Sequence, residues 1–228
     1  MTVQEIVTRV RAAIDELMPN DSQFLSQSND ELNLRDVIID KIGYALQHII
    51  ETAPLEKLGD TMLQSLGTSE LSSSFSIDSD SLVGTLSLPA DLLRIVEARL
   101  SSWSHFPLPE PDTSQVALMQ HDRYARGSWD RPVNILTYAY STTNKRVLKM
   151  YCARTTGDTL LFLYIKKPTL TNVDSSHLST EVSVPAKLEA AFIYQVAALS
   201  MVAFREDVAA SLFQIADRYM NGNNDNEG

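Results

Sequence analysis

Cysteine is almost absent from this sequence, and long apolar runs are missing. The 228-residue chain contains one cysteine, Cys152, so no disulfide framework can form within one copy. The longest apolar run, at 188–204, includes Glu189, Gln195 and Ser200. This run is too short and too polar to span a bilayer, and it predicts a buried helix. The N-terminus has no basic segment followed by an apolar one, so no signal peptide is expected.

Groups that carry catalysis or bind metals do not converge in the sequence. The histidines show neither H-x-x-x-H nor H-E-x-x-H spacing, which a zinc site would favour. They are His48, His105, His121 and His177. Cys152 has no local basic cluster, so a structural thiol is expected rather than a nucleophile. The G-x-S-x-G, Walker and G-x-G-x-x-G motifs are also missing. The sequence therefore predicts no enzyme, no catalytic, metal-binding or cofactor-binding residues, and no cofactor.

Charge is distributed unevenly along a chain whose formal net charge is -10. Residues 1–114 contain seven basic and 18 acidic residues, whereas residues 115–228 contain 12 basic and 11 acidic residues. Within the second half, the segment 121–167 holds nine basic residues and three acidic ones. Such a chain could dock on copies of itself or face nucleic acid along one edge. A merely solvated surface is the third interpretation.

Helical periodicity marks the N-terminal quarter. Thr2 and Glu5 have the spacing of a capping box, and the apolar residues after them lie on one face of a helix that Pro19 ends. Apolar spacing predicts a longer helix over 34–53, and residues 55–66 favour a further short one.

The C-terminal quarter is also helical in pattern. Pro185 suits the first turn of a helix over 185–204. This helix is apolar on nearly every face, so other elements must bury it. A second helix over 206–220 has one apolar stripe. We expect these helices to pack with the N-terminal ones as one bundle, with Leu199 at its centre. The polar residues 221–228 predict a disordered tail.

The pattern changes to strand-like periodicity in the middle of the chain. The serine-rich segment 68–81 predicts an exposed loop or an edge hairpin. Alternating apolar residues predict a strand over 81–89. The segment 94–103 favours a second strand, with a helix as the alternative.

Further strands are expected beyond a short helix at 114–124. The segments 133–140, 146–153 and 159–165 are rich in β-branched and aromatic residues and are separated by turn signals. They predict an antiparallel meander. The fold class is thus α+β, a helical bundle of N-terminal and C-terminal helices with an inserted antiparallel β module.

The corresponding domain boundaries follow from these patterns. Residues 1–66 and 185–220 form the helical bundle. Residues 67–184 form the antiparallel β module with its short helix, and 221–228 form the tail.

The segment "HDRYARGSWDRPV", residues 121–133, gathers arginine and aromatic side chains around Gly127. Its candidate subunit-interface residues are Arg123, Tyr124, Arg126, Trp129 and Arg131. Arginine beside aromatic rings can stack on bases and hold phosphates, and the same chemistry makes hot spots of protein interfaces. In a third interpretation, the tryptophan packs into the chain's own core and the arginines meet its carboxylates.

Several segments together resemble neck proteins of tailed bacteriophages. They are "LSLPADLLRIVEARLSSW" (86–103), "HDRYARGSWDRPV" (121–133), "LKMYCA" (148–153) and "LLFLYIKKP" (160–168). The chain is most similar to head-to-tail connector ring proteins of crAss-like phages. The "LP-x-D-x-L-R" turn lies at 88–94, and the "Y-x-R-G-[ST]-x-x-R-P-V" motif at 124–133. The family's "P-x-[IK]-P" element is matched only by "KKP" at 166–168.

The resemblance implies a structural virion protein. It implies a helical bundle with a β-sandwich-like module, assembled as a ring of about twelve copies below the portal. The ring would line the genome channel and join the capsid to the tail. Its partners would be its own copies, the portal protein and adjacent neck or tail rings, with no membrane. Genome DNA would pass without sequence-specific binding.

The same resemblance implies a place for the protein and a role for its turn. The protein would belong to the virion neck and would assemble in the host cytoplasm. The arginines of 121–133 would contact carboxylates of a neighbouring subunit or ring. A nucleic-acid-binding or enzymatic phage accessory protein is the alternative.

Overall fold

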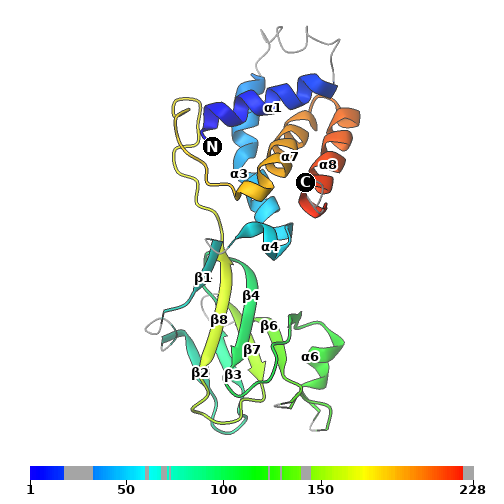
Figure 1. The fold of residues 1–228 in the computed structure, drawn as a ribbon. Coiled ribbons are helices and arrows are strands. Elements are labelled where there is room, and N and C mark those ends of the chain that lie inside the picture. The colour runs from blue at the N-terminus through cyan, green and yellow to red at the C-terminus, as the bar shows by residue number, and fades with distance from the viewer. Residues whose placement is uncertain are drawn as a thin grey trace, which may run out of the picture. The chain divides into compact units, whose positions relative to one another are not determined.

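The computed structural model shows how helical and strand-forming segments separate in space. It describes residues 1–17, 33–59, 62–67, 71, 73–122, 124–128, 130–139 and 145–222. The chain divides into two compact units, each drawn in Figure 1. The helical unit comprises Met1–Asp60 and Pro168–Gly228, and the β unit comprises Thr61–Lys167. The fold is α+β, as the sequence predicted.

Helix α1 (Val3–Leu17) buries the apolar face that its periodicity predicted. Its buried residues are Val3, Ile6, Val7, Val10, Ala13 and Ile14. Leu17, expected on the same face, is 39% exposed at the helix end. The Oγ1 atom of Thr2 accepts a hydrogen bond from the N–H of Glu5 at 3.2 Å, which confirms Thr2 as a capping residue.

The other N–H groups of the first turn of α1 find partners near the other end of the sequence. The N–H groups of Val3 and Gln4 donate to the carbonyls of Thr180 and Leu178, each at 3.0 Å. The first N–H groups of a helix have no intrahelical acceptor, and leaving them buried without partners is unfavourable. The segment 178–182 therefore completes a helix that begins some 175 residues earlier.

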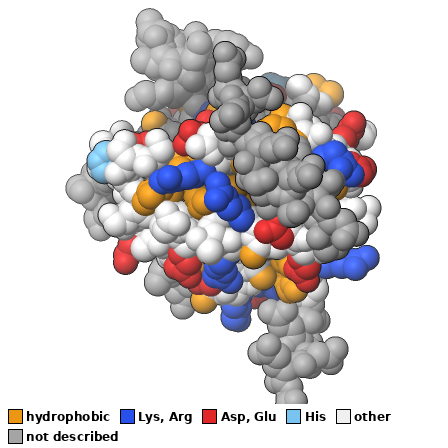
Figure 2. Space-filling model, turned by 90° about the horizontal axis from the view of Figure 1, so that it is seen from above, with side chains coloured by type: hydrophobic (Ala, Val, Ile, Leu, Met, Phe, Trp, Pro, Cys, Tyr) orange, Lys and Arg blue, Asp and Glu red, His pale blue; other side chains and the backbone are white. Residues whose placement is uncertain are grey.

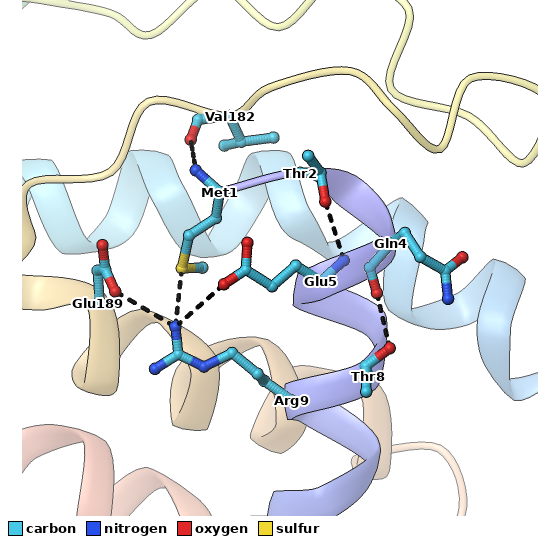
Figure 3. A network of polar contacts seen from close by, with 8 residues as sticks. All are labelled: Met1, Thr2, Gln4, Glu5, Thr8, Arg9, Val182 and Glu189. Atoms are coloured by element: carbon cyan, nitrogen blue, oxygen red, sulfur yellow. Dashed lines mark hydrogen bonds and ion pairs between the residues drawn. The ribbon is translucent and has the colours of Figure 1, made fainter.

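Figure 3 shows how the N-terminal residue joins this arrangement. Met1 and Val182 exchange two backbone hydrogen bonds, of 3.1 and 2.8 Å. The Nη1 atom of Arg9 lies 3.2 Å from Glu189 and 3.9 Å from Glu5. Because these charged side chains are exposed to water by about a third or more, their ion pairs contribute little stability.

Helix α3 (Leu34–Thr52) ends one residue before the predicted end at 53, with Ala53 as its C-cap residue and Pro54 after it. Its N-cap, Asn33, accepts a hydrogen bond from the N–H of Arg35 at 3.0 Å. Its apolar side is buried in the helical unit.

The expected helix at 55–66 is shorter in the structure, so that prediction was wrong in extent. Helix α4 spans only Leu55–Leu58 and ends at Gly59, whose φ of 74° suits glycine. Strand β1 (Leu63–Ser65) follows and pairs with a distant strand of the β unit.

Helix α7 (Glu189–Met201), entered through a 3-10 turn at Ala186–Leu188, is the centre of the helical unit. It packs against α1, α3 and α8 (Figure 1). Phe192 and Val196 are fully buried, whereas Leu199 is only partly buried. The prediction that this helix is buried by other helices is confirmed. Its central buried side chains are those of Phe192 and Val196, whereas the sequence had suggested Leu199.

Helix α8 (Glu206–Asn221) packs against α7, and a lysine of α4 binds carbonyl groups at the C-terminal end of α8. The Nζ atom of Lys57 is a buried group and donates to the carbonyls of Tyr219 at 3.2 Å and Gly222 at 2.5 Å. A cation at a helix C-terminus satisfies orphan carbonyls and complements the helix dipole. Tyr219 is half-exposed and stacks on Tyr194 with ring centroids 5.5 Å apart.

Among the described residues, the strands of the β unit form two sheets. The remaining strands are β2 (Phe75–Ile77), β3 (Gly84–Ser87), β4 (Leu92–Leu100), β5 (Pro109–Pro111), β6 (Val133–Ala139), β7 (Lys145–Tyr151) and β8 (Leu160–Lys166). One sheet has the order β1-β8-β4, and the other has the order β2-β3-β7-β6-β5. Neighbouring strands are antiparallel except β5 and β6, which are parallel.

The predicted meander of three strands is wrong at its last member. Strands β6 and β7 pair as expected, but β8 pairs with β4 and β1 in the other sheet. After β7 the chain leaves its sheet, because Cys152 adopts a φ of 73° and the N–H of Ala153 donates to the carbonyl of Leu82 at 2.9 Å. The residues before β8 do form a connection between strands, as predicted, but this connection leads from one sheet to the other.

The two sheets enclose one apolar core. Its members include Leu86, Leu148, Met150, Leu100, Trp103, Phe162 and Tyr164. Two polar side chains also join the sheets across the edge of β4. The amide Nδ2 of Asn134 donates to the carbonyl of Ala98 at 2.9 Å, and Arg146 donates to the carbonyl of Leu92 at 2.7 Å. Both bonds occupy edge carbonyls that could otherwise pair with another chain.

The units divide the chain at different places from those expected. The expected boundaries in the sequence fell after residues 66 and 184, whereas the boundaries of the compact units fall after Asp60 and Lys167. Strand β1 belongs to the β unit because it pairs with β8, and 168–184 belongs to the helical unit because 178–182 bonds to α1. Of the predicted tail, residues 223–228 lie outside the described residues.

Candidate subunit interface at the arginine turn

We name residues 121–133 the arginine turn. It connects helix α6 (Gln115–Met119) to strand β6. Ser114 caps α6, since its side chain accepts a hydrogen bond from the N–H of Ala117 at 3.2 Å. Ala117 is buried and fixes the short helix against the sheet.

A buried glutamine at the end of α6 holds the turn. Gln120 is 7% exposed, and its Nε2 atom donates to the carbonyl of Val116 at 2.8 Å. Its Oε1 atom accepts a hydrogen bond from the N–H of Gly127 at 2.9 Å. One side chain therefore ties the helix to the middle of the arginine turn. The sequence around Gln120 gives no sign of this role, because a glutamine at this spacing is common in helices.

The first half of the turn is built on Asp122. Its Oδ1 atom accepts from the N–H of Tyr124 at 2.9 Å, and its carbonyl accepts from the N–H of Arg126 at 2.9 Å. This backbone presents Tyr124 to solvent at 95% exposure. Tyr124 therefore does not anchor the turn in the core. Arg123 and Trp129 lie outside the described residues.

The second half is a tight reversal between Ser128 and Arg131. Their backbones exchange hydrogen bonds of 3.1 and 2.9 Å. The Ser128 hydroxyl donates to the carboxylate of Asp130, and this bond, followed by backbone contacts and the nearby charge of Arg131, lowers the pKa of Asp130. The carboxylate is therefore ionised at neutral pH beside an exposed arginine.

A glycine is favoured at position 127 because atoms of neighbouring residues approach its Cα closely, and not because of its φ angle. A Cβ atom there would lie 3.1 Å from the carbonyl oxygen of Arg131 and 3.1 Å from Cγ2 of Val133. The thiol of Cys152 donates to the carbonyl of Gly127. Burial raises the pKa of Cys152, so the thiol is protonated at neutral pH. This environment suits a structural thiol, as the sequence analysis expected.

Arg126 ties the turn to a neighbouring loop of the same chain. Its Nη2 atom donates to the carbonyl of Ser81 at 2.8 Å. That loop is organised by Asp78, which accepts hydrogen bonds from the N–H groups of Asp80 and Ser81. Arg126 is nevertheless exposed. Of the predicted interface residues, the structure thus gives Arg126 an internal contact and leaves Tyr124 and Arg131 facing solvent.

Exposed apolar side chains lie just before and within the arginine turn, a feature that the sequence analysis missed. They are Phe106, Leu108, Leu118, Met119 and Tyr124, with exposures of 45%, 71%, 66%, 41% and 95%. Leu118 and Met119 are consecutive residues of α6, and exposed apolar side chains that lie together are typical of surfaces that bind other proteins. Strand periodicity could not reveal it, because these residues lie in a loop and a short helix.

The two units differ in charge. The helical unit contains eight basic and 19 acidic residues, and the β unit contains eleven basic and ten acidic residues. On the face drawn in Figure 2, basic, acidic and apolar side chains are interspersed rather than gathered by sign. The excess of negative charge in the helical unit is thus given by its residue count, and it forms no single-sign patch on the face drawn in Figure 2.

The remaining polar candidates do not form a chemical site. Among the described residues, no three His, Cys, Asp or Glu side chains are grouped so that they could hold a metal ion. His177 pairs with Asp174 in the helical unit at 2.8 Å, whereas His121 belongs to the arginine turn. No helix in the described part of the chain has the length and apolar character needed to cross a bilayer.

A family model described as SU10 adaptor protein matches residues 1–226. The match includes both compact units and the whole arginine turn. A search of curated proteins found no match to the chain.

Proposed function

Because the chain belongs to the SU10 adaptor protein family, whose members are structural proteins of bacteriophages, we propose that it forms a head-to-tail connector ring. As a phage adaptor it is a virion component that contacts other capsid or tail proteins. In our proposal its copies form a closed ring in the neck, directly below the portal, and join the capsid to the tail. The ring encloses the channel through which the genome passes.

The observation that carries this proposal is the family match over residues 1–226. It favours a structural role over a nucleic-acid-binding or enzymatic accessory protein. The likeness of 86–103 and 121–133 to ring proteins of crAss-like phages narrows the proposal to that group. A ring of about twelve copies is the assembly that this likeness implies.

The charge difference between the units supports contacts between unlike surfaces. The helical unit has 11 more acidic than basic residues, whereas the β unit has one more basic than acidic residue. Unlike surfaces of identical copies attract each other in a heterologous contact, which closes into a ring when the rotation allows it. The overall negative charge also disfavours tight binding of DNA in the channel.

The proposal is tested by mixing the purified chain with its portal protein and measuring mass by native mass spectrometry. We expect a ring-sized complex that contains both proteins. The variant Arg131→Glu should weaken ring formation at least tenfold, because it reverses an exposed charge of the arginine turn. Lys167→Glu, an equal charge change elsewhere on the β unit, serves as the control. A chain that stays monomeric with and without portal protein would show that the proposed ring is wrong.

A further inference from the structure

A small pocket lies beside the arginine turn, on the face of the β2-β3-β7-β6-β5 sheet that points away from the core. Its volume is about 140 Å³. Its floor comes from β6 and β7, where Ile135 and Lys149 are direct cross-strand partners. Helix α6 supplies a wall through Ala117 and Leu118. Because Leu148 and Met150 point into the core, the intervening Lys149 must point into this outer pocket.

Three hydrogen-bond donors line the pocket: the ammonium of Lys149, the hydroxyl of Tyr151 and the imidazole of His121. Within the described residues, no hydrogen bond or ion pair joins these side-chain groups to another group of the chain. Burial raises the pKa of Tyr151, so its hydroxyl keeps its proton at neutral pH. The pocket thus presents a cation and two further donors to one small volume.

A single carboxylate matches these groups best. It carries one negative charge and accepts several hydrogen bonds, which are strong when the donor is a cation. A phosphate monoester, which carries more than one negative charge at pH 7, is less suitable, because Asp112 also lines the pocket and repels each added charge. The carboxylate of Asp112 already accepts a bond from Thr137 at 3.0 Å. Leu118, 66% exposed, adds the apolar contact typical of a protein partner.

We propose that this pocket receives an Asp or Glu side chain from the helical unit of a second copy of the chain. That unit contains 19 acidic and eight basic residues. The segment 112–167, which contributes all the residues that line the pocket, contains nine basic and four acidic residues. The inference rests on the proposed ring, in which each copy contacts the next through two different surfaces.

Carbodiimide cross-linking tests the contact directly, since this reagent joins an amine to a carboxylate only when they touch. Normal and nitrogen-15-labelled full-length chains are mixed, assembled with portal protein and cross-linked. We expect a mixed-isotope peptide that joins Lys149 to an Asp or Glu of the helical unit. Lys149→Met should abolish this product, and Lys149→Glu should weaken assembly at least tenfold. Tyr151→Phe should weaken assembly about twofold to fivefold, since it removes a single hydrogen bond.

The control variant is Lys167→Glu, which should leave assembly unchanged. Circular dichroism identifies a variant that fails to fold, and Lys149→Met then replaces the charge reversal. Wild-type protein that never assembles would overturn the ring and this inference together. A wild-type ring that Lys149→Glu leaves intact would overturn this inference alone, and so would a Lys149 cross-linked only within its own copy, to the β unit or to portal protein. If Lys149→Glu instead weakened binding of a double-stranded DNA oligonucleotide, the pocket would be a phosphate site and the inference wrong.

Discussion

The two units of this chain are stabilised in different ways. The helical unit surrounds α7, which is buried on nearly all sides by helices from both ends of the sequence. The β unit has its own apolar core, but its distinctive surface is shaped by polar side chains. Gln120 and Asp122 hold the arginine turn, while Asn134 and Arg146 cover the edge of β4.

This difference indicates that substitutions in the two units should have different effects. Burial in the helical unit is extensive, so one truncated side chain affects the whole unit. The polar contacts of the β unit are local, so each change should reposition one loop and leave the sheets in place. Core substitutions in the helical unit should therefore change its stability most, whereas substitutions at these polar contacts should change how the β unit presents its surface.

The largest expected effect is that of Phe192→Ala in α7. Phe192 is fully buried, so its truncation should lower the free energy of unfolding of the helical unit by about 3–5 kcal/mol. Calorimetry measures the change. If the units unfold separately, only one of two transitions should move. Val202→Ala, at a residue 54% exposed, is the control and should change stability by less than about 0.5 kcal/mol. Equal shifts of both transitions would break the comparison, because the units would then unfold as one.

A smaller effect is expected from Gln120→Met in the β unit. The substitution keeps the size of the side chain but removes the acceptor for the N–H of Gly127, which should cost about 1–3 kcal/mol. Hydrogen exchange at the Gly127 amide should become at least tenfold faster, while amides of β7 stay protected. Gln115→Met, at an exposed position of the same helix, should leave both unchanged. Uniform loss of protection across the sheets would contradict the idea that these contacts act locally.

The smallest effect concerns Asp158, in the connection between β7 and β8. Burial raises the pKa of this carboxyl, but hydrogen bonds from Ser102 and from the N–H of Arg154 outweigh it and lower the pKa overall. A lowered folded pKa gives stability that is present above about pH 4, the unfolded value, and is lost as the pH falls through the folded pKa.

Asp158→Asn should therefore destabilise the β unit by about 1 kcal/mol at pH 7 and by less at pH 3. Urea unfolding at the two pH values measures the difference. An equal loss at both values would mean that the ionised carboxylate does not stabilise this turn.

Much of the fold could be predicted from periodicity. The capping residue Thr2, the end of α3 before Pro54 and the burial of α7 all follow from local residue types. The partner of β8 could not be predicted in this way, because a strand's pattern shows which face is buried and says nothing about its neighbour. The change of sheet depends on Cys152 at positive φ, a conformation that its residue type does not favour.

The arginine turn was predicted as a turn, but its internal contacts were not. The sequence indicated a turn rich in arginine around Gly127, and the structure presents Tyr124 and Arg131 on it. It could not show that Arg126 donates to the carbonyl of Ser81, because that residue is 45 positions away in the chain. The role of Gln120 could not be predicted either, because its hydrogen bond to the N–H of Gly127 depends on where the fold places Gly127.

The hydrogen bonds from Val3 and Gln4 to the carbonyls of Thr180 and Leu178 have a consequence for the order of events during translation. The β unit is one continuous stretch, so all of its strands have been synthesised once residue 167 has left the ribosome. Helix α1, which precedes the β unit in the chain, must wait for residues 178–182 to complete its first turn and for α7 to cover its apolar face. The apolar face of α1 therefore stays incompletely covered until α7 has been made, so this helix reaches its native environment after the strands of the β unit have been synthesised.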